Sequence, residues 1–160
     1  SNWLMEVYHA SSVIVDSPDV VHSRAFLDFG KGFYMTTIRE QAEKYALRFL
    51  RRNKEAWLNI YELDEAYLAY RVKTFTEYNE EWLDFVAQCR TGRDVENYDI
   101  IMGGIANDKV FRTIDLFFAG DITKETALKR LVFEKVNHQI CISNQEVIDR
   151  CLTYKSSIRL

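Results

Sequence analysis

The stretch Asp28-Phe29-Gly30-Lys31-Gly32-Phe33-Tyr34-Met35-Thr36-Thr37 organises the chain. Two of the chain's six glycines lie here, one residue apart, and an aromatic, β-prone run follows them at once. Glycine at this spacing is typical of backbone that turns sharply or approaches another group closely. A strand leaving such a turn would fix Tyr34 on a rigid sheet. Two interpretations stay open at this point: the edge of a ligand-binding site, or a tight turn that enters a core strand.

The composition indicates a globular domain. The 160 residues suffice for a single domain over 1–160 with one substantial core. Hydrophobic residues make up 48% and aromatic residues 14%, which excludes a disordered tail. The formal net charge of −3 argues against non-specific nucleic-acid binding, because such binding needs a basic face.

Cysteine usage and hydropathy restrict the cellular setting. The odd number of cysteines (Cys89, Cys141 and Cys151) and their unpaired spacing favour reduced thiols and a cytoplasmic location. The three histidines are isolated and no Cys-x-x-Cys occurs, so we expect no metal site. We also expect no signal peptide and no membrane association, since no apolar run approaches the length of a membrane span.

Hydrophobic periodicity predicts an α+β fold. We expect strands over 4–8, 32–36, 56–63, 66–73, 98–102 and 137–143, and a surface loop over 13–26. We expect helices that begin near residues 38, 77, 110, 123 and 144. Thr37, Thr123 and Asn144 are the predicted N-caps. Strands and helices do not alternate regularly, which favours α+β over a doubly wound α/β fold.

Common catalytic motifs are missing from the sequence. It contains neither a Gly-x-Ser-x-Gly elbow nor a Walker-type phosphate loop. The cysteines fall on apolar helix faces and in a strand, which is typical of inert core cysteine. What remains is a set of polar residues at predicted strand ends, namely His9, Tyr34 and Gln139. Each of them alone is more typical of a structural role.

Several segments together resemble the DUF3990 family of the ADP-ribosyltransferase-like superfamily. The resemblance rests on Tyr8-His9-Ala10-Ser11, on the Asp28–Thr36 segment, and on Glu81-Trp82-Leu83-Asp84-Phe85-Val86. It continues through Tyr98-Asp99-Ile100-Ile101-Met102-Gly103-Gly104 up to Asp108 and through His138-Gln139-Ile140-Cys141-Ile142. It implies a split, clamp-like β-sheet with surrounding helices, and NAD bound in a cleft between two half-sheets.

The resemblance also implies roles for individual residues. His9 would hydrogen-bond a ribose hydroxyl of NAD, and the backbone of Ala10 would meet the nicotinamide carboxamide. Tyr34 would stack its ring on the cationic nicotinamide. The implied catalytic set is Tyr34, Gln139 and His9. The implied NAD-binding set is His9, Ala10, Ser11, Gly30, Gly32, Phe33, Tyr34, Thr36 and Gln139.

Gln139 stands where the superfamily commonly has glutamate. A glutamine can hydrogen-bond a ribose hydroxyl, but it supplies neither negative charge nor a base. Asp108 is a candidate substitute carboxylate, although a place in the helix N-cap region near Val110 explains it better, and Lys31 has no assigned partner.

The resemblance implies an NAD-dependent mono-ADP-ribosyltransferase of a bacterial toxin-like type. The enzyme would transfer ADP-ribose to an unknown protein or nucleotide acceptor, release nicotinamide and need no metal. The alternatives are a catalytically weakened NAD-binding module, or a protein-interaction module with a small antitoxin-like protein partner.

Overall fold

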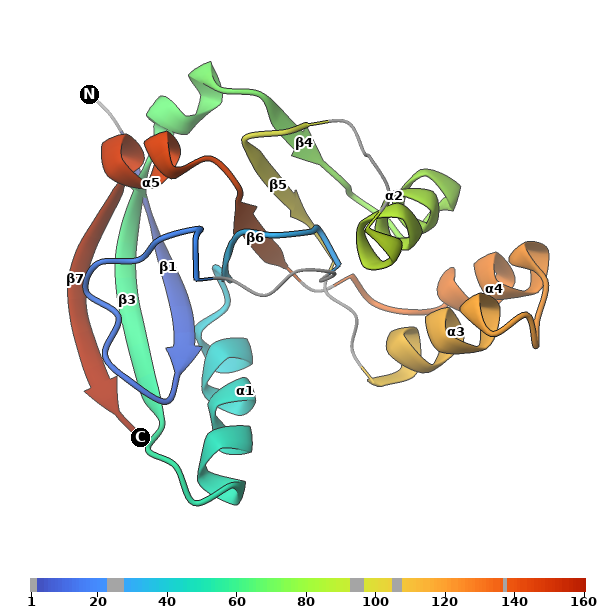
Figure 1. Ribbon diagram of the computed structural model, residues 1–160, viewed down its shortest axis with the longest axis horizontal. Coiled ribbons are helices and arrows are strands. Elements are labelled where there is room, and N and C mark those ends of the chain that lie inside the picture. The colour runs from blue at the N-terminus through green and yellow to red at the C-terminus, as the bar shows by residue number, and fades with distance from the viewer. Residues whose placement is uncertain (1–2, 23–27, 93–96, 105–107, 137) are drawn as a thin grey trace.

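The computed structural model describes residues 3–22, 28–92, 97–104, 108–136 and 138–160, and the side chain of Asp108 is also outside this description. The described residues form a mixed α+β structure with two β-sheets and five α-helices. Predictions that concern 23–26, 105–107 and Asn137 therefore lie outside the described residues. In Figure 1 the three-stranded sheet lies on the left and the α3–α4 helix pair on the right.

The first sheet contains the two longest strand pairings. Its strand order is β1 (Leu4–Ser11), β3 (Trp57–Asp64) and β7 (Leu152–Arg159), all antiparallel. Cross-strand partners point to the same side, so Val7, His9, Asn59 and Tyr61 share one face. The helix α1 (Arg39–Arg51) covers the other face, where Ala42 meets Tyr8, Leu58 and Ile60.

The second sheet lies between two hydrophobic cores. Its order is β2 (Phe33–Met35), β6 (Gln139–Ile142), β5 (Ile100–Gly103) and β4 (Val72–Thr74), with β4 and β5 parallel. One face packs against α2 (Glu80–Thr91), α3 (Asp108–Phe118) and α4 (Lys124–Leu131). The opposite face meets the first sheet and α5 (Gln145–Cys151). A 3₁₀ turn, η1 (Glu65–Ala69), connects β3 to β4.

The two sheets meet at an isolated bridge between Tyr8 of β1 and Thr36, one residue beyond β2. The Tyr8 amide donates to the Thr36 carbonyl at 2.8 Å, and the Thr36 amide donates to the Tyr8 carbonyl at 3.0 Å. We call this junction the seam, defined by Tyr8, His9, Tyr34 and Thr36. Since the ladder does not continue along β1 and β2, the sheets separate on either side of the bridge.

Most predicted elements are confirmed, including the N-caps of α4 and α5. The Thr123 side chain accepts from the Thr126 amide, and Asn144 accepts from the Glu146 amide. The predicted cap at Thr37 is wrong: the N-cap position is Ile38, which makes no side-chain cap. The Ile38 amide donates instead to Thr36 Oγ1 at 3.0 Å.

Two further predictions are wrong. The predicted strand over 66–73 is largely η1, and only Val72–Thr74 is extended. The predicted strands stop at residue 143, but Leu152, directly after α5, begins β7, a strand that periodicity did not indicate. Within the described ranges, no helix combines the length and apolar character needed to cross a bilayer.

Candidate functional site at the seam

The glycines of the Asp28–Thr37 stretch have distinct structural roles. Gly30 adopts φ +81°, a left-handed conformation that favours glycine. A Cβ on Gly32 would lie 2.4 Å from Cys141 Sγ and 2.8 Å from the Ile142 carbonyl oxygen. The turn therefore needs glycine at 30 for its direction and at 32 for close packing against β6. This confirms the tight-turn interpretation, and the ligand-edge interpretation stays a prediction.

The hydroxyl of Tyr34 is held within the same turn. The Phe29 amide donates to the Tyr34 oxygen at 3.1 Å, and the Tyr34 hydroxyl donates to the Gly30 carbonyl. Burial is the main cause that raises the pKa of Tyr34, and the neighbouring Cys141 adds to it. The phenol therefore stays neutral, and any contribution of Tyr34 to ligand binding comes from its half-buried ring.

His9 links the two sheets through its side chain. Its Nδ1 lies 2.7 Å from the Tyr34 carbonyl oxygen. Because a carbonyl only accepts, Nδ1 carries the proton and Nε2 is the unprotonated nitrogen. The His9 ring also packs on Phe33, with 4.4 Å between ring centroids. Burial lowers the pKa of His9, while the hydrogen bond to Tyr34 opposes this effect.

Gln139 begins β6 and is buried, with 6% of its surface exposed. Its Nε2 has no hydrogen-bond partner among the described residues. A buried amide nitrogen without a partner costs about 1–3 kcal/mol, so it is expected to meet an acceptor in the functional state. Trp82 Nε1 is likewise unpartnered, but its indole packs edge-to-face on Tyr78 inside the core.

The register of the second sheet brings Tyr34 and Gln139 to the same face. Tyr34 pairs with Cys141, and Gln139 lies two residues from Cys141 along β6. Residues two apart on a strand point to the same side, so Gln139 and Tyr34 are diagonal neighbours. His9 of β1 bonds the Tyr34 backbone carbonyl, and its ring packs on Phe33, whose side chain points to the opposite face of β2 from the Tyr34 ring. The register thus places Gln139 next to the seam at Tyr34.

The other predicted binding residues surround this group with different degrees of burial. Phe33 is in the core and its ring packs between the rings of His9 and Tyr61, so it helps to hold the His9 ring in place. Thr36 is buried at the bridge and its hydroxyl accepts from the Ile38 amide. Ala10 and Ser11 end β1, and Ser11 Oγ accepts from the Val13 amide at 3.3 Å. Lys31 is exposed.

Two residues near the seam were not predicted from the sequence. Asn59 is fully buried and donates to the carbonyls of His9 (3.2 Å) and Val13 (3.3 Å). His138 Nδ1 lies 3.1 Å from Thr37 Oγ1, and burial lowers the pKa of His138. The one sequence signal for Asn59 was an asparagine in the interior of the predicted strand 56–63.

A buried ion pair connects the turn to α2. The Arg90 guanidinium donates to Asp28 Oδ1 through Nε at 2.9 Å and through Nη2 at 2.5 Å. The side chains are 14% and 13% exposed, respectively. The same guanidinium lies over the Phe111 ring of α3, 4.4 Å from its centroid.

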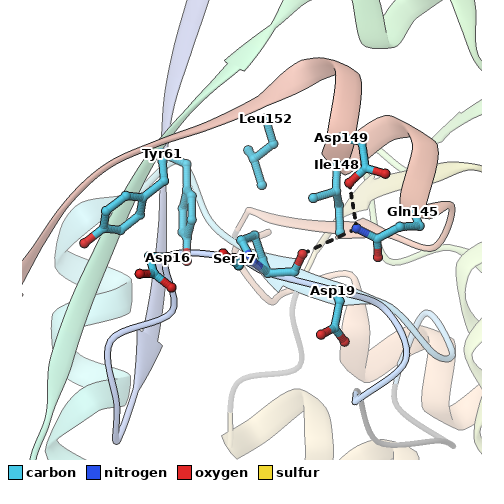
Figure 2. A pocket seen from close by; sticks show the side chains of 10 residues that line it. Asp16, Ser17, Asp19, Tyr61, Gln145, Ile148, Asp149 and Leu152 are labelled. Atoms are coloured by element: carbon cyan, nitrogen blue, oxygen red, sulfur yellow. Dashed lines mark hydrogen bonds between the residues drawn. The ribbon is translucent and has the colours of Figure 1, made fainter.

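The best-defined cavities lie away from the seam. One, of about 400 Å³, lies between the loop after β1, α5 and β7 (Figure 2). Gln145 Nε2 donates to Asp149 Oδ1 and to the Pro18 carbonyl, and Figure 2 shows Asp16 below Tyr61 and Asp19 below Gln145. Three aspartates on its wall make it electrostatically unsuited to an anionic dinucleotide. The other, of about 560 Å³, lies along the outer side of α3.

The donor set at the seam fits an organic ligand better than a metal. The described residues contain no group of three or more His, Cys, Asp or Glu side chains placed to hold a metal ion. An amide donor, an imidazole nitrogen and an aromatic ring suit hydroxyl and ring groups. The three thiols are buried and free, and burial raises the pKa of Cys89 to about 11 and that of Cys141 to about 12. These thiols are poor nucleophiles.

Fold and site together define an α+β protein with a candidate ligand-binding site where two sheets join. The chain belongs to the DUF3990 family: the family model, described as a protein of unknown function (DUF3990), matches residues 5–154. No curated protein and no solved structure matches the chain.

Proposed function

We propose that the chain binds NAD at the seam and transfers ADP-ribose to a macromolecular acceptor with release of nicotinamide. In this proposal the two sheets are the halves of an ADP-ribosyltransferase-like clamp. The observation that supports it most is the buried, unpartnered Nε2 of Gln139 on the same sheet face as the Tyr34 ring, where His9 bonds the Tyr34 carbonyl. A ribose hydroxyl offers that nitrogen the acceptor that the described protein residues do not.

Each residue would contribute a limited part. Nε2 of His9 accepts from a ribose hydroxyl, and its Nδ1–H keeps the ring aligned on the Tyr34 carbonyl. The Tyr34 ring offers a face to the cationic nicotinamide. In the reaction the bond between ribose C1′ and the nicotinamide nitrogen breaks, and its electron pair leaves with nicotinamide. The acceptor atom then bonds to C1′ and gives its proton to solvent or to a base.

A second candidate function is an NAD-binding or protein-interaction module with little transfer. The observation that favours it is the amide of Gln139, which supplies no negative charge to the cation that forms as nicotinamide leaves. In either case we propose a cytoplasmic, toxin-like protein that has a small antitoxin-like protein as its partner. The buried free thiols support the cytoplasmic part of this proposal.

Label transfer from NAD separates these functions. The full chain is incubated with labelled NAD and a cell lysate, and both transferred label and free nicotinamide are measured. We expect transfer by wild type, reduced transfer in Tyr34→Phe, which keeps the ring but loses the two hydrogen bonds of the hydroxyl, and loss of transfer in Tyr34→Leu. Saturable NAD binding without nicotinamide release supports the module instead. Absence of NAD binding contradicts both NAD-based functions and leaves protein interaction.

A further inference from the structure

We infer that Arg90 is a positioning residue: through Asp28 it fixes the Asp28–Gly30 turn that bonds the Tyr34 hydroxyl, and it ties that turn to α2 and α3. Arg90 lies in the last turn of α2, far from the seam in sequence. It contacts neither His9 nor Gln139 in any interaction of the described residues. Its effect on the site is therefore transmitted through the Asp28–Gly30 backbone.

The first part of this connection is the ion pair itself. Two nitrogens of one guanidinium bond the same Asp28 oxygen, and both side chains are largely removed from solvent. A charged hydrogen bond in such a setting is strong and directional. Loss of the arginine would leave a buried carboxylate without its partner, which the turn can relieve only by moving Asp28 toward water.

The second part runs from Asp28 to Tyr34. Phe29, the next residue, donates its amide to the Tyr34 oxygen at 3.1 Å, and the Gly30 carbonyl accepts the Tyr34 hydroxyl proton. Both bonds belong to a three-residue turn whose first residue is held by Arg90. Displacement of Asp28 therefore breaks the two contacts that orient the phenol.

The third part is α3, which holds the guanidinium from the opposite side. Arg90 lies over the Phe111 ring at 4.4 Å and more distantly over the Phe118 ring at 6.0 Å. Asp115 Oδ1 is 3.8 Å from Arg90 Nη1. Arg90 therefore contacts both the Asp28–Gly30 turn and α3, whose Phe111 and Asp115 also line the cavity along that helix.

Amide hydrogen exchange on the full chain tests this inference without any ligand. In Arg90→Met we expect the Phe29 amide to exchange about tenfold faster or more, while β3 amides keep their protection. In Arg90→Lys we expect a smaller acceleration of about threefold, because one ammonium replaces the fork and its stacking on Phe111. The matched control is Lys124→Met. It removes the two ion pairs that Lys124 of α4 makes with Glu80 and Asp84, which lie on α2 like Arg90.

The outcomes separate cleanly. Phe29 exchange at the wild-type rate in a folded Arg90→Met chain overturns the inference; if that chain does not fold, wild-type exchange in Arg90→Lys overturns it.

The consequence for NAD rests on the proposed function: Arg90→Met should raise the NAD Kd about tenfold, Lys124→Met should not, and the effect should vanish in a Tyr34→Leu background. An unchanged Kd with faster Phe29 exchange overturns that consequence. Failure of wild type to bind NAD contradicts the proposed function and leaves the exchange result standing.

Discussion

At the residue scale, the side chain of Gln139 has the largest effect on what the proposed site can bind and cleave. Its amide is nearly enclosed, and one of its two polar atoms has no partner among the described residues. A carboxylate in the same place would attract the positive charge that develops on ribose, whereas an amide dipole does so weakly. The side chain is thus suited to hold a hydroxyl group and poorly suited to promote bond cleavage.

Substitution of Gln139 tests this division. Gln139→Glu should keep NAD binding and raise nicotinamide release about tenfold or more, since it adds negative charge beside the reacting ribose. The carboxylate of Gln139→Glu can still accept a hydrogen bond from a ribose hydroxyl, whereas Gln139→Leu keeps the volume, has no hydrogen-bonding group and should lose binding. Nicotinamide release is measured by chromatography, and the NAD Kd by calorimetry. Loss of NAD binding in Gln139→Glu would show that the site has been misplaced.

His9 predicts how stability depends on pH. Burial lowers its pKa below the ordinary 6.5, so the folded chain keeps the imidazole neutral while the unfolded chain gains a proton. The contribution is complete above pH 6.5 and is lost as pH falls through 6.5 toward the depressed folded pKa. The free energy of unfolding should fall by up to about 1.4 kcal/mol per pH unit for this group.

Denaturant titrations between pH 7.5 and 5 measure this slope. His9→Gln should flatten it, leaving a residual slope of the same sign from His138, whose pKa burial also lowers. His22→Gln is the control, because that side chain is exposed and paired with Asp19. An identical slope in wild type and His9→Gln would contradict a buried neutral His9.

At the element scale, α2 supplies both core residues and Arg90, and its start depends on a local cap. The Asn79 side chain accepts from the Trp82 amide at 3.0 Å. Asn79→Ala should lower the free energy of unfolding by about 1 kcal/mol, and Asn79→Asp should retain most of it. Thermal or urea unfolding measures both. Equal losses in the two variants would mean that the oxygen does not cap the helix.

The elements that sequence predicts well are those with local signals. The caps at Thr123 and Asn144 and the C-terminal Gly92 of α2 follow from residue type alone, and the structure has all three. The missed strand β7 has no such signal. A bulge between Ile60 and Tyr61 leaves Lys155 outside the register, so the period-two pattern is interrupted in the middle of the strand.

The residues of the candidate site likewise fall into those that the sequence could indicate and those that it could not. His9, Tyr34 and Gln139 could be named because a family resemblance marks them, and sheet pairing brings their strands together. Arg90, Asn59 and His138 could not, because their importance depends on partners 62, 50 and 101 residues away. A charged side chain near a helix end looks solvated in sequence until the chain that covers it is known.

At the scale of the whole molecule, the seam is where the two sheets meet. The first sheet is covered by α1 and the second by α2, α3 and α4, with a shared core between them (Figure 1). Their bridge at Tyr8 and Thr36 puts His9 beside the backbone of Tyr34. A ligand held at this position would contact both sheets, which is what a clamp requires.

NMR titration with NAD tests the central claim most directly. The side-chain amide of Gln139 is assigned by its disappearance in Gln139→Leu and then followed as NAD is added to the full chain. A seam that binds NAD predicts a saturable shift of this resonance, together with shifts at the amides of His9 and Tyr34. No change at Gln139 with millimolar NAD, or shifts confined to the cavity between α5 and β7, would contradict it.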